Sequence, residues 1–218
     1  MSKVPGSRCQ ASSIEGAASW AGETLETKVV LPRDHKVERV NAILNRMKKY
    51  KDAVPGFDIK GVVSTPRDTA YASLTTMPDG DEILEIGEVG RMDDLTLTRI
   101  FQKEQQSGYR VPGGGPVEAT ADHEFAHHLD DKMGLENDPL ITSVHNQFHT
   151  FADMKNNVSG LAAKDKHEFI AECWVEGINA YRPRKTAAAV TGRILTRINR
   201  KRGSVGLPPI TKEYFQGG

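Results

Sequence analysis

The sequence predicts an α+β protein, because a block of strand-like segments lies between helical segments instead of alternating with them. Its 218 residues are 38% hydrophobic and 27% charged, which is enough apolar material for a core. The two cysteines, Cys9 and Cys173, are far apart and give no disulfide framework. No run of about 18 apolar residues is present, so we expect no contact with a membrane interior.

The first half predicts a leader, a helix and a strand block. Residues 1–33 are small, polar and aperiodic, and we expect a flexible leader. A helix is expected from Asp34 to Tyr50, because apolar residues recur on one of its faces. Strands are expected at Ile59–Thr65, Ala70–Met77 and Glu82–Val89. The turn residues Pro78-Asp-Gly-Asp81 make the last two a hairpin.

The second half predicts helices. One runs from Asp93 or Asp94 to about Ser107, and another covers Pro116–Met133, with proline at its start and Gly134 as its stop. A short helix is expected near Ser143–Met154. Asp165–Tyr181 and Thr186–Arg202 complete the set.

The helix at Pro116–Met133 carries the pattern His-Glu-x-x-His. His123 and His127 are four residues apart, so their imidazoles lie side by side on one helix face and suit one zinc ion. Glu124 projects from the adjoining face and can take a proton from a zinc-bound water. His128, which directly follows the second histidine of the pattern, is expected to be exposed. This pattern predicts peptide-bond hydrolysis by a zinc-activated water with a glutamate base.

A hydrolytic zinc site needs a third protein ligand and one open position. Glu168 and Glu172 lie one turn apart on the helix that begins at Asp165, and either can return to the histidines. Asp165-x-x-Glu168 also has the form of a helix N-terminal capping arrangement. We expect Glu168 as the ligand and Glu172 in support of the site, with the reverse assignment left open.

The segments HEFAHHLDD and KHEFIAECWVE resemble the zinc endopeptidase family of anthrax lethal factor and the Pro-Pro endopeptidases, which includes phage-associated and toxin-associated members. The resemblance implies His123, His127 and Glu168 as ligands and Glu124 as the base. It also implies that Asp130 holds a ligand imidazole in its tautomer.

The same resemblance implies a zincin-like fold, in which a small mixed sheet packs on the His-Glu-x-x-His helix and on the glutamate-bearing helix. The catalytic domain is then 34–182, between the leader 1–33 and a basic tail at 183–218. An edge strand lays a peptide or protein substrate across the cleft, and the hairpin that ends in Glu82–Val89 is the candidate for that edge.

One position departs from the family pattern. The family carries a tyrosine seven residues before the third ligand, and this chain has Leu161 there. Tyr109, His167 and Tyr181 are candidates to replace that donor. The departure supports an alternative, a catalytically reduced zincin-fold protein with a structural or virion-associated role.

The C-terminal residues are strongly basic. Nine Lys/Arg lie between Arg182 and Gly218, against the single acid Glu213. Such a tail is a candidate docking surface for nucleic acid or an acidic partner, and a solvated, partly helical tail is the alternative. A third interpretation is a nucleic-acid-binding module in which the histidine motif is incidental. Without a signal peptide, the expected location is the cytoplasm or a virion.

Overall fold

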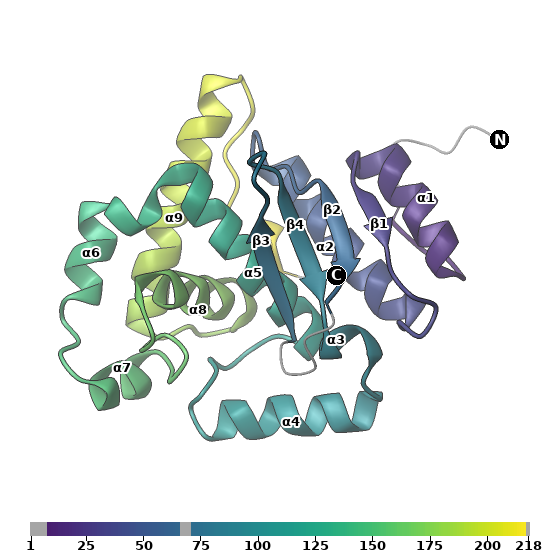
Figure 1. The fold of residues 1–218 in the computed structure, drawn as a ribbon. Helices are drawn as coiled ribbons and strands as arrows, with labels where there is room; N and C mark the ends of the chain where they lie inside the picture. The colour runs from purple at the N-terminus through teal and green to yellow at the C-terminus, as the bar shows by residue number, and fades with distance from the viewer. Residues whose placement is uncertain (1–7, 66–70, 217–218) are drawn as a thin grey trace.

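A mixed four-stranded sheet and a set of helices on one side of it make up the structure, a computed structural model that describes residues 8–65 and 71–216 (Figure 1). The elements in chain order are α1 Ile14–Leu25, β1 Lys28–Val30, α2 Val37–Ala53, β2 Gly61–Ser64, β3 Ala72–Thr76, β4 Glu82–Ile86, α3 Glu88–Arg91, α4 Asp94–Gln106, α5 Pro116–Met133, η1 Leu135–Asn137, α6 Pro139–His145, α7 Phe151–Asn157, α8 Lys166–Asn179, α9 Lys185–Ser204 and η2 Lys212–Tyr214.

The sheet has the strand order β1-β2-β4-β3. β1 pairs parallel to β2 and β2 parallel to β4, whereas β3 runs antiparallel to β4. The predicted hairpin is confirmed, although Ala70 of its first strand lies outside the described residues. The hairpin also supplies an edge of the sheet, as expected: β3 forms that edge, beside α5, and β4 lies inside the sheet.

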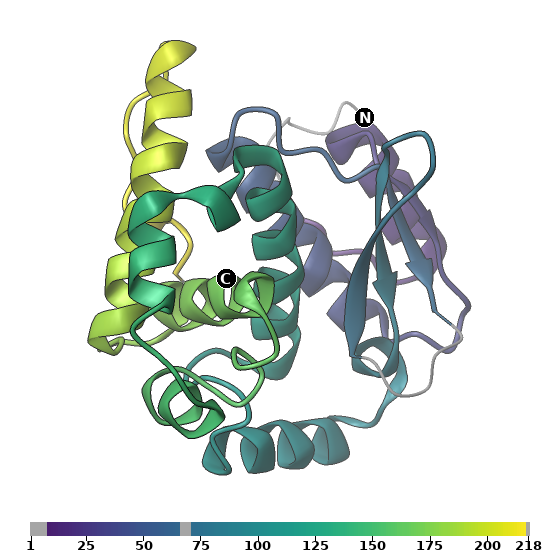
Figure 2. The same cartoon turned by 60° about the vertical axis from the view of Figure 1, so that its left-hand side comes forward.

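The helices lie in layers on one side of the sheet. α2 and α5 pack against each other, and in Figures 1 and 2 α5 runs between the sheet and α8. α9 packs on α8 on the side away from the sheet. Because α5 has neighbours on both sides, almost its whole circumference is buried.

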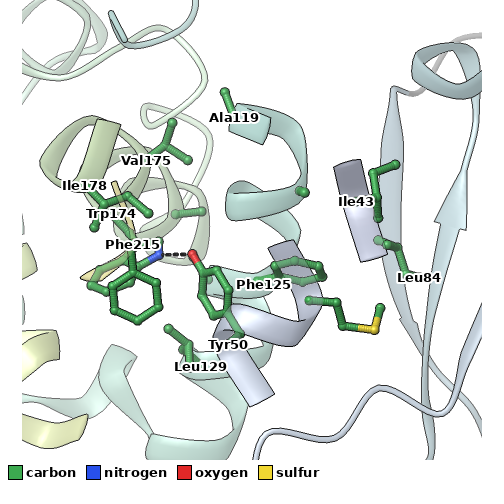
Figure 3. Close-up of a cluster of buried hydrophobic side chains, with 14 of the residues drawn as sticks. Ile43, Tyr50, Leu84, Ala119, Phe125, Leu129, Trp174, Val175, Ile178 and Phe215 are labelled. Carbon is green, nitrogen blue, oxygen red and sulfur yellow. Dashed lines mark hydrogen bonds between the residues drawn. The ribbon is translucent and has the colours of Figure 1, made fainter. Parts of the chain in front are cut away.

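Aromatic side chains from four segments meet at the centre (Figure 3). The ring of Tyr50 lies 5.0 Å from that of Phe125 and 4.9 Å from that of Phe215, and Trp174 Nε1 donates a hydrogen bond of 2.6 Å to the Tyr50 hydroxyl. These contacts join α2, α5, α8 and the C-terminal residues into one core.

Residues 1–33 were expected to be a flexible leader, and the described part, 8–33, is instead ordered structure. Ser13 caps α1 by accepting from the Gly16 amide at 3.1 Å, and Trp20 and Leu25 are buried. β1 then adds an edge strand to the sheet. The helix escapes notice in the sequence because small residues weaken its apolar pattern: alanine and glycine fill five of its 12 positions.

Residues 183–218 were expected to be a partly helical tail. The helix is confirmed as α9, but its apolar side chains are buried against α8, and Phe215 is 0% exposed within the aromatic cluster. One continuous set of buried residues runs from Cys9 to Phe215, so a boundary at residue 182 does not separate two units in the described chain. Within the described ranges, no helix has the length and apolarity needed to cross a bilayer.

α8 and α9 cross at Gly177. A Cβ placed on Gly177 would lie 1.9 Å from Thr191 Oγ1, so the two backbones can approach only because this residue has no side chain. We expect Gly177→Ala to lower the free energy of unfolding by about 1–3 kcal/mol through overpacking. Gly192→Ala is the matched control, because no atom lies within 4 Å of that position, and it should stabilise α9 slightly. Urea denaturation of both variants measures the difference, and equal stabilities would contradict the tight crossing.

Candidate metal centre

Helix α5 forms as the sequence predicts. Pro116 occupies its first turn and Gly134 ends it with a left-handed backbone (φ 60°). His123 and His127 are one turn apart, and the former is 5% exposed. Their rings face each other with centroids 4.9 Å apart.

Three ligand-type atoms converge at one point. His123 Nε2 lies 3.2 Å from His127 Nε2 and 3.0 Å from Glu168 Oε2, and one ligand atom from each of the three residues lies within 4.8 Å of the others. Glu168 Oε2 is buried, and its contact with His123 lacks the geometry of a hydrogen bond. Glu168 therefore turns toward the histidines, while Asp165 alone caps α8 by accepting from the Glu168 amide at 2.8 Å.

These distances suit a tetrahedral zinc site. Zinc binds imidazole nitrogens at about 2.0–2.1 Å, which separates two such ligands by about 3.3 Å. The observed separation of the two Nε2 atoms is 3.2 Å. Two nitrogens and one carboxylate oxygen are also a donor set that zinc accepts in hydrolytic enzymes.

Glu172 supports His123 from behind. Its Oε1 lies 3.1 Å from His123 Nδ1, and its Oε2 accepts from the Val111 amide at 3.0 Å. A carboxylate at Nδ1 keeps the proton on that nitrogen and leaves the Nε2 lone pair facing the convergence point. The sequence suggested Glu172 in this role but gave no sign of the Val111 amide, which is a backbone group.

The electrostatics of the cluster favour a cation. Burial by itself lowers the pKa of His123, but the carboxylates of Glu168 and Glu172 against its ring raise that pKa to about 10. Burial, together with the charge on His123, lowers the pKa of His127 to about 4. Carboxylates packed against the histidine pair thus favour a positive charge there, and a bound metal ion would supply it.

Glu124 lies beneath the edge strand. Its Oε2 accepts a hydrogen bond of 2.9 Å from the Leu74 amide of β3. Burial raises the pKa of Glu124, whereas the nearby His123 lowers it. The residue is 8% exposed, so it is positioned by the strand and partly shielded from water. The contact with Leu74 could not be foreseen, since any residue type can supply a backbone amide.

Asp130 does not contact a ligand imidazole in the structure. Its Oδ2 lies 2.8 Å from His167 Nδ1, and its Oδ1 accepts from the Glu136 amide at 2.8 Å. The expected role of Asp130 is therefore corrected. The side chain of Asp130 lies between the turn after α5, where Glu136 is, and the start of α8, where His167 is.

His128 was expected to be exposed and is 0% exposed. Its Nδ1 is hydrogen-bonded to the carboxylate of Glu82 on β4, and the Asp58 amide lies 3.4 Å from its Nε2. The buried pair ties the site helix to the sheet. Sequence periodicity could not place it, because α5 is covered on nearly all sides.

Comparison with known proteins adds little. No protein-family model matches the chain, and no curated protein matches it at a significant level. A solved structure described as a "putative zinc-binding metallo-peptidase" from Bacteroides caccae ATCC 43185 aligns with 95% of this chain and 91% of that chain, at 12% identity and a TM-score of 0.48. A likeness of that size carries no weight for fold or activity, so a proposal of function rests on the side chains of the metal centre.

Proposed function

We propose that the chain is a zinc-dependent endopeptidase. The observation that carries the proposal is the convergence of His123 Nε2, His127 Nε2 and Glu168 Oε2, with Glu124 beside them under an edge strand. His123, His127 and Glu168 would hold one zinc ion, and Glu172 would fix the tautomer of His123. Zinc, when bound, makes a water molecule more acidic and polarises a carbonyl oxygen.

Glu124 is the proton carrier in this proposal. Its carboxylate takes the proton of the attacking water and delivers it to the nitrogen of the leaving amine. The Leu74 amide holds Oε2 of Glu124, which orients the carboxylate. Burial raises the pKa of Glu124, and this makes it a stronger base than an exposed glutamate.

The substrate is an extended peptide that adds to β3. The Gly87 amide donates to the Tyr71 carbonyl at 3.0 Å, so the odd-numbered residues of β3 pair with β4. Ala72, Leu74 and Thr76 therefore direct their backbone groups away from the sheet, toward α5. The Leu74 amide is held by Glu124, so a peptide strand would pair with the backbone groups of Ala72 and Thr76 and with the Leu74 carbonyl, and it would then lie across the metal centre.

The test is zinc content by elemental mass spectrometry, combined with cleavage of a peptide library. We expect about one zinc per chain, loss of zinc in Glu168→Ala, and cleavage that a chelator abolishes. Glu172→Gln is the matched variant. We expect its zinc affinity to fall about 10–100-fold, but an excess of zinc should still fill the site. The proposal fails if supplemented protein binds no zinc, or if the chelator leaves cleavage intact.

A second candidate function is a zincin-type protein that binds zinc without cleaving peptides. Leu161, at the position of the family tyrosine, favours it: the side chain has no donor and is 5% exposed. Of the candidate replacements, His167 is held by Asp130, and Tyr181 is 87% exposed on the α8–α9 link. Tyr109 is beside Leu161, whose amide donates to the Tyr109 carbonyl at 2.9 Å. A zinc-loaded native protein that cleaves nothing would establish this function.

A further inference from the structure

Four of the nine basic residues near the C-terminus have partners inside the protein. Arg184 binds Glu176, Arg193 and Arg197 both bind the buried Asp138, and Arg202 donates to the Ala53 and Pro208 carbonyls. Their charge is used to fix α9 in place. Only the remaining cations of this region are available to an outside partner.

Two of the remaining cations border a groove. It lies between the last turn of α5 and the last turns of α9 and has a volume of about 340 Å³. Its lining consists of Lys132, Met133, Arg197, Arg200, Lys201 and Ser204. The wall thus includes four cations from two helices, one hydroxyl and no acid.

The cations differ in how firmly they are held. Asp138 fixes the guanidinium of Arg197 at 2.7 Å, so this group is preorganised. Lys132 is 41% exposed, with its Nζ 3.8 Å from the Glu82 carboxylate. Arg200 and Lys201 form no ion pair within residues 8–65 and 71–216. Asp138 compensates the charge of Arg197 and Glu82 lies near Lys132, so Arg200 and Lys201 supply the groove's uncompensated positive charge, which a bound anion would balance.

Helix geometry accounts for only part of this arrangement. Cations in a last turn offset the partial negative charge of the helix C-terminus. That effect needs one or two cations on each helix facing solvent. It gives no reason for cations of two separate helices to face one shared groove.

We propose that this groove binds a phosphate-bearing anion, either a free polyphosphate or the backbone of a nucleic acid. Arg200 offers a planar fork that matches phosphate oxygens, Lys201 offers an ammonium group, and Ser204 offers a further donor. No aromatic ring is among the lining residues, so bases would not stack there and binding would be independent of sequence. The volume lies at the low end for small-molecule pockets and suits a few phosphates, not a folded protein surface.

The experiment measures binding of tripolyphosphate by calorimetry and of a labelled single-stranded oligonucleotide by fluorescence anisotropy. The variant Arg200→Ser/Lys201→Ser removes two groove cations. Its matched control, Arg182→Ser/Lys185→Ser, removes the same charge near the other end of α9. We expect the groove variant to bind about tenfold more weakly, and the control to bind as the native chain does.

For the oligonucleotide, the slope of log K against log salt should fall by about 1.4 in the groove variant, since each lost contact to a single strand contributes about 0.7. Binding of tripolyphosphate alone identifies a free polyphosphate as the ligand. Tighter binding of the oligonucleotide, displaced by tripolyphosphate, identifies a nucleic acid.

Three results would overturn the proposal: binding of neither probe, equal loss in both double variants, or equally tight binding of polyglutamate. The last would show a preference for any acidic chain. None of the substituted residues belongs to the metal centre, so zinc content and peptide cleavage serve as a separate check that the variants are folded.

Discussion

Glu124→Gln is expected to lower kcat for peptide cleavage by about 10²–10⁴-fold while the zinc content stays at one per chain. The amide keeps the size of the carboxylate, so the ligand geometry is preserved, but it cannot take a proton from water. Its carbonyl oxygen can still accept the Leu74 amide, which now lies 2.9 Å from Oε2. The loss should therefore appear in kcat, with little change in KM.

Asp131→Asn is a suitable control for that measurement. Asp131 is an exposed acid on the same helix, and its loss changes the net charge by the same amount. Steady-state kinetics on both zinc-loaded variants separate the outcomes. Equal rates for Glu124→Gln and the native chain would remove Glu124 from the mechanism and leave zinc binding untouched.

Arg46→Met is expected to lower the free energy of unfolding by about 3–5 kcal/mol. Arg46 donates two hydrogen bonds of 2.6 Å to Asp122, and the two side chains are 5% and 0% exposed. Asp122 also accepts from the Tyr50 hydroxyl at 3.0 Å and from Asn179 Nδ2 at 2.8 Å. Removing the guanidinium leaves a buried carboxylate with neutral partners only, and this is the costly state.

Two comparisons make the result specific. Arg193→Met removes an arginine from Asp138 but leaves Arg197 in place, so we expect a loss of at most about 1 kcal/mol. Arg46→Met/Asp122→Leu removes both buried charges and should be more stable than Arg46→Met alone. Urea denaturation gives all three values. If Arg46→Met is no less stable than Arg193→Met, the buried Arg46–Asp122 pair contributes little to stability.

The predictions from sequence succeeded where the signal was local. Proline and glycine mark the ends of α5, and the turn residues mark the β3–β4 hairpin, so both appear as predicted. The spacing of His123 and His127 fixes their shared face in any helix. The sequence favoured Glu168 over Glu172 but left the reverse assignment open, because each of the two carboxylates is within reach of a returning helix.

The failures concern contacts between distant segments. The partner of Arg193 and Arg197 is Asp138, more than 50 residues earlier, so their charges looked free in the sequence. His128 looked exposed because its neighbours come from distant segments, namely Glu82 on β4 and the stretch Phe57–Asp58. Asp130 took a partner on α8 that no pattern within α5 could indicate.

The Arg46 network also bears on the order of folding. The guanidinium of Arg46 reaches partners 76, 133 and 169 residues away along the chain, at Asp122, Asn179 and Phe215. Contacts of such high sequence separation close late, because the loop entropy is lost before the contact is gained. Helix α5 depends on local contacts and can form early. Asp122 precedes His123 on α5, and Asn179 lies on α8 with Glu168, so we expect the metal centre to assemble only once this network has closed.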